Sequence, residues 1–407
     1  MGQFRFLSAG ESHGRGLTAL VEGIPAGVPI SEDYIQTDLA RRQRGYGRGG
    51  RMEIERDRAE ITSGVRHGLT MGSPISMLIW NRDWETGGDP DKVAWTDVMS
   101  TTPTTVEYNR ITRLRPGHAD TPGISKYQQN DARNILERSS ARESAARVAA
   151  GALARGMLES FGIEIHSQVL GIGGVHARRV ERPDWSQVEE SRVRCADAEA
   201  EEQMVAAIDA ASEAGDSLGG VIEVVATGVP VGLGTHIQWD RKLSTRLAAA
   251  VMSINAVKGV EFGAGFAQAE IRGSEVHDVI LPVDEWPRGE DGEWVRPWPR
   301  RSNNSGGLEG GMTTGEPLVV RAMVKPIATI KNPLPSVNLE TGELVQAHYE
   351  RSDITFVPTC GVIGEAMVGI VLADAILEKF GGDHIDETVR NWRAFMKTVG
   401  PAHRVEG

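Results

Sequence analysis

The stretch Arg138-Ser139-Ser140-Ala141-Arg142-Glu143 decides how the middle of the chain folds. Ser140 stands three residues before Glu143, which is the spacing of a capping box, and an alanine-rich segment follows. This pattern predicts a helix over residues 140–161. Free backbone N–H groups and the positive end of the helix dipole meet at such a start, and two arginines lie beside it, so the position suits a phosphate. A lone capping box more often marks an ordinary core helix, which is the alternative interpretation.

Residues 110–120, just upstream, collect cations around a single acid. They contain Arg110, Arg113, Arg115 and His118, with Asp120 as the acid. Arginine binds phosphate and carboxylate through paired hydrogen bonds, so this cluster strengthens the prediction of an anion site.

A second arginine cluster covers residues 41–51, Arg-Arg-Gln-Arg-Gly-Tyr-Gly-Arg-Gly-Gly-Arg. It holds five arginines and four glycines, and no acid occurs between Leu39 and Met52. Such a loop can fold its backbone around an anion, and arginines that repel one another gain by sharing one. A solvated charged surface is the alternative, because exposed charges contribute little to stability.

Composition narrows the class of protein. The 407 residues carry a net charge of −12, which argues against general nucleic-acid binding, and only two cysteines occur. Cys195 and Cys360 lie too far apart in sequence to suggest a metal pair or a disulfide framework, and no metal site is expected. The first residues lead directly into a strand-like pattern without a signal peptide, and no run of eighteen apolar residues is recognised. A cytoplasmic protein without membrane contact is therefore expected.

The pattern of elements predicts an α+β fold. Residues 140–161 and 360–380 are apolar over most of the helix circumference, so both helices should be buried between layers. The strand-like segments alternate between apolar and polar residues, which favours antiparallel sheets. We therefore expect helices sandwiched between antiparallel β-sheets in a single large domain over residues 1–407. The other predicted helices are 31–44, 199–214 and 241–258, the predicted strands include 4–9, 17–22, 163–174, 221–226 and 318–324, and mobile loops are expected near 83–107 and 282–300.

Two rival function classes are tested by the sequence. Ser12 in Gly10–Gly14 and Ser217 match the Gly-x-Ser-x-Gly pattern of a serine hydrolase, which must lie between a strand and a helix. A strand is expected after Ser12, and a helix before Ser217, so both matches fail on context. Rossmann and P-loop nucleotide sites are excluded by the absence of their glycine motifs. A flavin- or anion-binding module without catalysis remains the second alternative.

Six motifs together resemble the chorismate synthase family. They are Gly-Glu-Ser-His-Gly at 10–14, Arg-Arg-x-Arg-Gly-Tyr-Gly-Arg-Gly at 41–49, Arg-Pro-Gly-His-Ala-Asp at 115–120, Arg-Ser-Ser-Ala-Arg-Glu at 138–143, Gly-Gly-Leu-Glu-Gly-Gly-Met at 306–312 and Arg-Ser-Asp at 351–353. They follow one another in order from Arg5 to about Phe380. The Trp- and Pro-rich segment 282–300 departs from the family without touching a motif.

The resemblance implies a carbon–oxygen lyase that acts on phosphate. Members of the family remove phosphate and one hydrogen from 5-enolpyruvylshikimate 3-phosphate in a 1,4-elimination, which gives chorismate in the last step of the shikimate pathway to aromatic amino acids. They need reduced FMN although the reaction has no net redox change, and they are usually homotetramers whose helices lie between antiparallel sheets.

The resemblance also assigns roles to residues of this sequence. The catalytic residues are His13 at the leaving phosphate, His118 at the flavin ring and Asp353 as the proton acceptor. The substrate-binding residues are Arg42, Arg48, Arg51, Arg115 and Arg142. The FMN-binding residues are Arg138, Ser139, Ser140, Asn255, Ala256, Gly310, Lys325, Pro326, Ile327, Ala328, Thr329 and Arg351. Two sources of electrons stay open, namely NADPH bound at Arg42 and Arg48, or an external flavin reductase.

Overall fold

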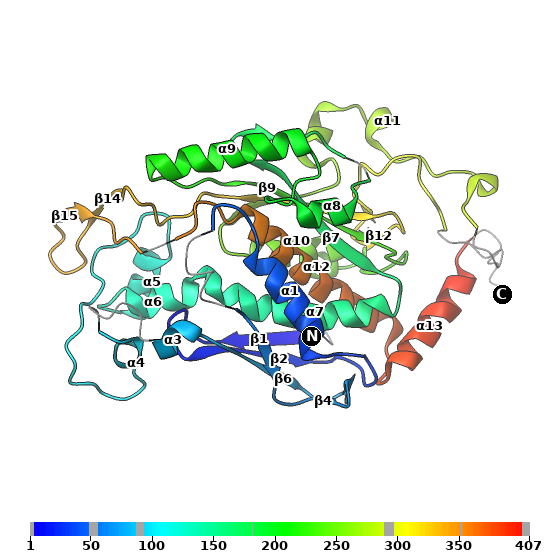
Figure 1. Ribbon diagram of the computed structural model, residues 1–407. Coiled ribbons are helices and arrows are strands. Elements are labelled where there is room, and N and C mark those ends of the chain that lie inside the picture. Colours follow the sequence, from blue (N-terminus) through cyan, green and yellow to red (C-terminus); the bar gives the residue numbers. More distant parts are fainter. Residues whose placement is uncertain are drawn as a thin grey trace.

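Two apolar helices that pack against each other form the centre of the protein, α7 (Ser144–Glu159) and α12 (Val357–Phe380) (Figure 1). The computed structural model describes residues 4–48, 56–86, 93–180, 182–288, 297–350 and 352–400, except the side chains of residues 85 and 86. Small residues line both helices, and Gly151 of α7 approaches Ala366 of α12 so closely that an added Cβ would lie 2.3 Å from the alanine Cβ. Glycine is therefore required where the two helices cross.

A four-stranded antiparallel sheet covers α7. Its order is β1 (Arg5–Ala9), β2 (Gly16–Glu22), β6 (Ile75–Trp80) and β3 (Ala59–Ile61). The buried residues of β2 alternate with exposed or half-buried ones, and β2 contacts α7. The alternation that predicted this strand therefore turns its apolar side toward the helices.

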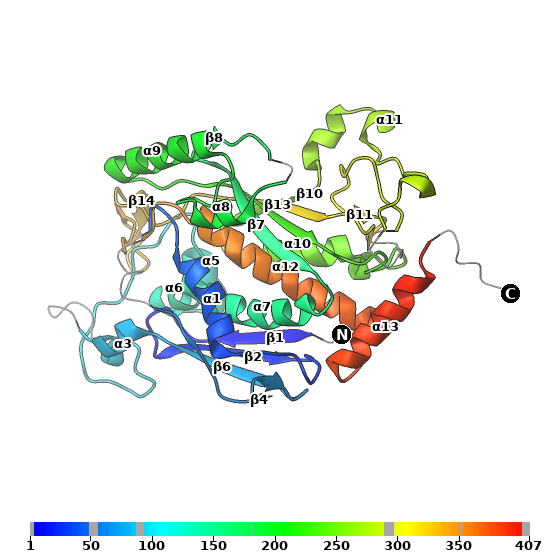
Figure 2. The same ribbon diagram turned by 45° about the vertical axis from the view of Figure 1, so that its right-hand side comes forward.

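A five-stranded antiparallel sheet lies against α12. Its order is β10 (Val257–Phe262), β13 (Leu318–Val324), β9 (Gly220–Thr227), β7 (Glu164–Ile172) and β8 (Val175–His176). Strands β7 and β9 contact α12, and α9 (Ala198–Ala214) contacts β7 and β8. Figure 2 shows, from top to bottom, α9, this sheet, α12, α7 and the four-stranded sheet. The predicted mixture of helices and strands in one chain is confirmed.

The remaining elements surround this centre. The helices are α1 (Glu32–Gln43), α3 (Arg82–Thr86), α4 (Trp95–Val98), α5 (Asp120–Tyr127), α6 (Arg133–Ser139), α8 (Trp185–Glu190), α10 (Leu243–Met252), α11 (Gly273–Val276) and α13 (Ile385–Thr398). Short hairpins pair β4 (Val65–Arg66) with β5 (Leu69–Thr70), β11 (Leu308–Glu309) with β12 (Met312–Thr313), and β14 (Pro335–Val337) with β15 (Leu344–Gln346). Single 3-10 turns are η1 (Ala141–Glu143), η2 (Trp239–Arg241), η3 (Gly265–Glu270) and η4 (Val283–Glu285).

Several predicted boundaries are wrong. The helix expected over 140–161 is split, because Ser140 has extended backbone angles that end α6, and η1 then leads into α7. The helix expected over 241–258 ends at Met252, since the chain enters strand β10 at Val257. The loop expected at 83–107 contains α4 and most of α3. The mobility expected near 83–107 and 282–300 concerns in part residues 87–92 and 289–296, which lie outside the described residues.

By length and composition, helix α12 is long and apolar enough to cross a membrane. The sequence pattern did not predict a segment of this kind. The most apolar eighteen-residue window of α12 is 94% buried inside the protein. A buried core helix passes the same test, so this property is explained by packing between the two sheets.

A fully buried charged residue lies in the middle of this apolar helix. Glu365 of α12 is fully enclosed and accepts hydrogen bonds from Arg41 (2.8 and 2.9 Å), Arg155 (2.6 Å), Arg194 (3.1 Å) and Ser167 (2.6 Å). Burial alone would raise the pKa of Glu365, but the three guanidinium charges outweigh it and hold this pKa well below its usual range. An ionised carboxylate thus fastens α1, α7 and the strand β7 to the central helix.

Two more carboxylates complete the cluster. Asp38 bonds Arg41 at 2.9 Å and lies 3.2 Å from Arg155, while Glu189 accepts from Arg41 at 2.6 Å and from Arg194 at 2.8 Å. Burial would raise the pKa of Glu189, but Arg41 and Arg194 outweigh this effect and lower the pKa to about 2. Three carboxylates therefore balance three arginines inside the protein.

Glu365→Gln should destabilise the protein by about 3–5 kcal/mol, because three buried arginines lose a charged partner. Carboxylates with a depressed pKa stabilise the fold above their unfolded value of about 4.3, and this stability is lost as the pH falls below it. Denaturant unfolding at pH 7 and at pH 3 should therefore show a smaller pH dependence for the variant. Glu164→Gln, at a mostly exposed position of β7, is the matched control and should change little. Equal stability of Glu365→Gln and Glu164→Gln would contradict the role of this cluster.

Candidate functional site

His13 lies in the turn between β1 and β2, where a carboxylate and an indole hold it. Its backbone N–H donates to Glu137 Oε2 at 2.7 Å, and its ring Nδ1 lies 3.0 Å from both oxygens of that carboxylate. The imidazole stacks on Trp95, with 4.0 Å between ring centroids and an interplanar angle of 18°. Arg133 donates to Glu137 Oε1 at 2.8 Å. Both the position and the plane of the His13 ring are thereby fixed.

The charge of Glu137 determines the tautomer of His13. Burial would raise the pKa of Glu137, but the hydrogen bonds from His13 and the charge of Arg133 outweigh it and keep this pKa below its usual range. An ionised carboxylate only accepts hydrogen bonds, so Nδ1 of His13 carries its hydrogen. Proton exchange with a ligand is then left to Nε2.

Arg42 and Arg142 meet at one aspartate. Arg42, at the end of α1, and Arg142, in η1, each donate to a different oxygen of Asp57, and all three side chains are buried. Arg42 also donates to Ser144 Oγ at 3.2 Å. No acid lies between Leu39 and Met52, yet Arg42 has a counter-charge, because Asp57 follows slightly later in the chain.

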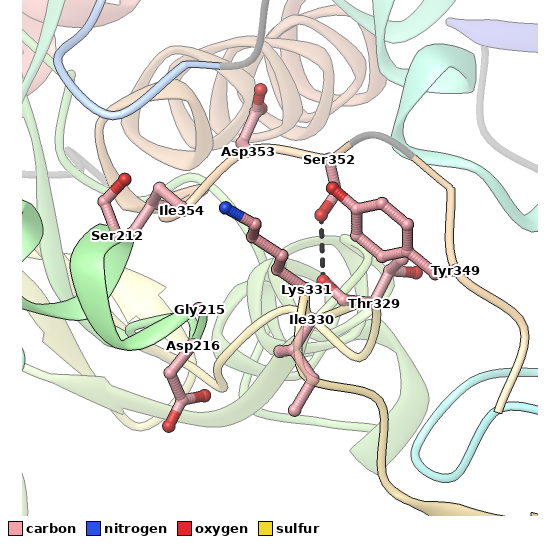
Figure 3. A pocket seen from close by; sticks show the side chains of 10 residues that line it. All are labelled: Ser212, Gly215, Asp216, Thr329, Ile330, Lys331, Tyr349, Ser352, Asp353 and Ile354. Carbon is pink, nitrogen blue, oxygen red and sulfur yellow. Dashed lines mark hydrogen bonds between the residues drawn. The ribbon is translucent and has the colours of Figure 1, made fainter. Parts of the chain in front are cut away.

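Arg48 and Asp353, predicted as substrate ligand and proton acceptor, form an ion pair at 3.2 Å. Arg48 also donates to Thr359 in the first turn of α12. Asp353 borders a cavity of about 200 Å³ that Thr329 and Lys331 also line (Figure 3). In this view the Lys331 side chain extends toward the segment of Asp353 and Ile354, and the Asp353 carboxylate points away from it. The structure thus joins the Arg-rich loop to the Arg-Ser-Asp motif.

Arg115 and His118 share Asp120. Arg115 donates to both carboxylate oxygens through Nε (3.0 Å) and Nη2 (3.1 Å), and to Thr329 Oγ1 through Nη1 (3.1 Å). His118 Nδ1 lies 2.6 Å from Asp120 Oδ1 and 3.0 Å from Arg115 Nη2. The shorter contact places the hydrogen on Nδ1, since a carboxylate can only accept. Burial would raise the pKa of Asp120, but the bonds from His118 and Arg115 hold it below its usual range.

The segments predicted to bind a flavin lie close to this cluster. Asn255 Nδ2 donates to the carbonyl of Ser139 at 3.0 Å, and the Lys325 N–H donates to the carbonyl of Ala256 at 2.9 Å. A Cβ added to Gly117 would lie 3.7 Å from both Ala328 Cβ and Lys325 Nζ. Residues 325–329, residues 255–256 and the turn before His118 therefore form one continuous surface.

Lys325 supplies an unsatisfied positive charge on that surface. Burial and the neighbouring charge of Lys258 lower the pKa of Lys325. Its ammonium group is 3.4 Å from the carbonyl of Pro326, the partner found for it among the described residues. Two lysines that repel each other, and that form no ion pair with a carboxylate of the described residues, fit a phosphate.

The Ser140 region differs from the predicted capping box. Ser140 Oγ accepts from the Arg142 N–H at 3.3 Å, whereas the Glu143 carboxylate accepts from Ser8 and Arg147. Arg138 donates to the carbonyls of Ser8 and Gly10, so it holds the β1–β2 turn onto α6. Ser140 therefore caps η1 rather than α7.

Three other predicted site residues are not gathered here. Gly310 lies in the turn between β11 and β12, and the carbonyl of the following Gly311 accepts a hydrogen bond from the Leu243 N–H at 2.8 Å. Both ribbon views place this hairpin away from α5 and α6 (Figures 1 and 2). Arg51 and Arg351 lie outside the described residues. No group of metal-binding side chains occurs within the described part of the chain.

The serine hydrolase alternative finds no support in the geometry. Ser217 is buried and donates its hydroxyl to the carbonyl of Ile327 at 2.7 Å, and Ser12 is buried with Ser140 donating to it at 3.2 Å. The His13 Nδ1 is engaged by Glu137. A serine nucleophile needs a base within hydrogen-bond reach, whereas the Ser217 hydroxyl is already donated to a backbone carbonyl.

Sequence reasoning missed the residues that hold the predicted ones in place. They are Asp57, Asn81, Trp95 and Glu137. Sequence reasoning also missed Lys258 as a second positive charge beside Lys325. Asp57 and Glu137 could have been found only as counter-charges for neighbouring arginines, because the fold and not the sequence brings them together. Trp95 begins α4, within the segment 83–107 that the sequence predicts as a loop.

Comparisons with known proteins identify the family of this chain. A family model described as chorismate synthase matches residues 4–377. Relatives named chorismate synthase include those of Geobacter sulfurreducens (53% identical; 97% of this chain and 99% of the relative covered) and Aquifex aeolicus (50%; 97% and 98%). A solved structure titled as the crystal structure of chorismate synthase aligns with a TM-score of 0.76 at 43% identity, covering 97% of this chain and 98% of that chain.

Proposed function

The chain belongs to the chorismate synthase family, and we infer that it catalyses the reaction of that family. As a carbon–oxygen lyase it converts 5-enolpyruvylshikimate 3-phosphate into chorismate by 1,4-elimination of phosphate, in the biosynthesis of aromatic amino acids. The observation that best supports this function is the group of Arg42, Arg48 and Arg142 near the His13 turn. Their charges act on one another, as their contributions to the lowered pKa of Arg42 indicate. A substrate with one phosphate and two carboxylates would relieve this repulsion.

We propose that His13 is the acid at the leaving phosphate. Glu137 and Trp95 hold its ring, and Nε2 is the nitrogen opposite the one that faces the carboxylate. A proton given to the phosphate oxygen as its bond to carbon breaks would avoid the release of a more highly charged leaving group. Ser12 precedes His13 in the turn and links it to Ser140.

Asp353 is proposed as the acceptor of the substrate proton. A carboxylate that becomes protonated gives up its ion pair, so Arg48 must then find another anion. The substrate offers one, and Arg48 would turn from Asp353 to the substrate as it binds. Arg51 and Arg115 complete the proposed substrate contacts, although Arg115 is already held by Asp120.

Reduced FMN is the proposed cofactor. When bound, it would supply electron density to the substrate transiently, without net oxidation or reduction. Lys325 and Lys258 would hold its phosphate, while Asn255, Ala256 and residues 326–329 would surround it together with Arg138, Ser139, Ser140 and Arg351. The Nδ1–H of His118 is directed at Asp120, so Nε2 would face the flavin ring. There it would stabilise the negative charge of the reduced flavin.

The origin of the electrons and the assembly are part of the proposal. NADPH at Arg42 and Arg48 is one proposed reductant, and an external flavin reductase is the other. We propose a cytoplasmic homotetramer of one β-α-β sandwich domain per chain. Exposed apolar residues favour association, including Leu7 opposite Leu20 on the outer side of the four-stranded sheet. Gly310 would reach a flavin only from a neighbouring copy, given its distance from α6 within one chain.

The function is tested by anaerobic turnover. The protein with 5-enolpyruvylshikimate 3-phosphate and dithionite-reduced FMN should release chorismate and phosphate in equal amounts, measured by absorbance and phosphate assay. A parallel reaction with NADPH and oxidised FMN distinguishes an enzyme that reduces its own flavin from one that needs a reductase. Absence of chorismate with fully reduced FMN would contradict the function.

His13 and His118 should fail in different ways. His118→Ala should alter the absorbance of bound reduced flavin, because the flavin ring loses its neighbour, whereas His13→Ala should leave that spectrum nearly unchanged. His13→Ala should slow phosphate release by about 10–1,000-fold, and less at low pH, where the phosphate carries its own proton. His277→Ala, at an exposed position after α11, is the control. Identical flavin spectra for the two site variants would exclude this division of roles.

Lys258→Ala should weaken FMN binding by up to about fivefold, since one charge beside the proposed phosphate position is lost. The effect should shrink at high ionic strength, where salt screens the lysine. Fluorescence titration of FMN measures it, and the exposed Lys397→Ala serves as the control. If Lys258→Ala and Lys325→Ala both bind FMN like the wild type, the phosphate lies elsewhere.

A further inference from the structure

Asp57 is a buried carboxylate for which the proposed reaction has no direct use. It is 1% exposed, and its two oxygens are divided between Arg42 and Arg142, which are 2% and 5% exposed. Its backbone N–H donates to Gln43 Oε1 at 3.2 Å, so the end of α1 fixes it from another side. The carboxylate is therefore held in place by the same helix that carries Arg42.

Two guanidinium charges and one carboxylate charge meet in this group of three side chains. Two guanidinium groups face one carboxylate, and like charges repel strongly where water is excluded. Burial lowers the pKa of Arg42 despite Asp57, and the charges of Arg142 and Arg48 add to this effect, while the two arginines hold the pKa of Asp57 below its usual range. The buried Nε–H of Arg42 also has no partner among the described residues. The Arg42 Nε–H thus remains as a donor for an anion.

Asn81 connects this cluster to the His13 turn. Arg142 Nε donates to Asn81 Oδ1 at 2.9 Å, and Asn81 Nδ2 donates to the carbonyls of Gly14 (2.7 Å) and Glu11 (3.1 Å). Asn81 is itself 1% exposed. A shift of Arg142 would therefore be transmitted to the backbone on both sides of His13.

We propose that Asp57 is a positioning residue that clamps Arg42 and Arg142 together, so that both bind one anionic group of the substrate beside the His13 turn. Asp57 does not touch the substrate in this arrangement. It offsets the repulsion between the two guanidinium groups and fixes their orientation, and Asn81 keeps the clamp aligned with His13. The inference rests on the proposed function, because it assigns Arg42 and Arg142 to the substrate.

Asp57→Asn is the test, because it preserves shape and removes the charge. The dissociation constant of 5-enolpyruvylshikimate 3-phosphate, measured by calorimetry with saturating FMN, should rise by about tenfold to a hundredfold. FMN affinity should change less than about threefold, since the lysines proposed for its phosphate keep their charges. Asn81→Ala, which leaves Asp57 in place, should raise the substrate constant by about threefold to tenfold through loss of one hydrogen bond.

Asp38→Asn is the matched control. Asp38 is also a buried aspartate bridging two arginines, Arg41 and Arg155, in the core cluster. It should lose stability as Asp57→Asn does, yet bind substrate like the wild type. A purely structural role for Asp57 predicts equal substrate binding in the two variants.

Two outcomes would overturn the proposal, and Arg42→Ala tells them apart. Substrate affinity of Asp57→Asn within about threefold of the wild type, or tighter, while Arg42→Ala binds weakly, would show that the clamp does not position the arginines. Unchanged substrate binding by Arg42→Ala itself would remove the arginine assignment on which the inference rests. If Asp57→Asn does not fold, Asn81→Ala and Arg42→Ala still decide between these outcomes.

Discussion

The structure depends on the ionised Glu365 in the middle of an apolar helix. A buried carboxylate is stable only with charged partners, and Arg41 of α1, Arg155 of α7 and Arg194 before α9 provide them. Because Arg41 and Arg42 are neighbours in α1, the bond that neutralises Glu365 also sets where Arg42 can reach. Thr359, one and a half turns earlier in α12, donates to the Arg42 carbonyl at 3.2 Å and accepts from Arg48. The same helix therefore fixes the core and the start of the arginine-rich loop.

The arginines of the site share one electrostatic design. Arg42 and Arg142 are held by Asp57, Arg48 by Asp353, and Arg115 by Asp120. When a guanidinium group already pairs with a carboxylate, part of the free-energy cost of removing it from water is met during folding. Its side chain has also lost its rotational freedom before a ligand binds. An incoming anion then adds to or replaces a chain carboxylate rather than ordering a free side chain. This accounts for dense arginine clusters in a chain whose net charge is −12.

The sequence predicted the elements that local pattern controls and missed those that distant contacts control. Alternation identified β2 and β7, and Gly381 marks the end of α12 as expected. The split at Ser140 was not predictable, because Ser140 bonds Ser12 and the Arg142 N–H, and Asn255 takes the carbonyl before it. The motifs named most of the candidate site, but their counter-charges Asp57 and Glu137 carry no local signal. Repulsion among clustered arginines implies such acids without telling where in the chain they lie.

The break between α6 and α7 explains why local helix propensity gives way at this point. A continuous helix through residues 133–159 would bury more backbone hydrogen bonds, yet it would direct Glu137 and Arg142 along one axis. With Ser140 extended, α6 turns Glu137 toward His13, while η1 turns Arg142 toward Asp57 and Asn81. The lost helical bonds are replaced by the cap from Ser140 and the bond from Asn255. The kink thus brings the proposed proton donor and the proposed anion ligands to one place, which neither helix could do alone.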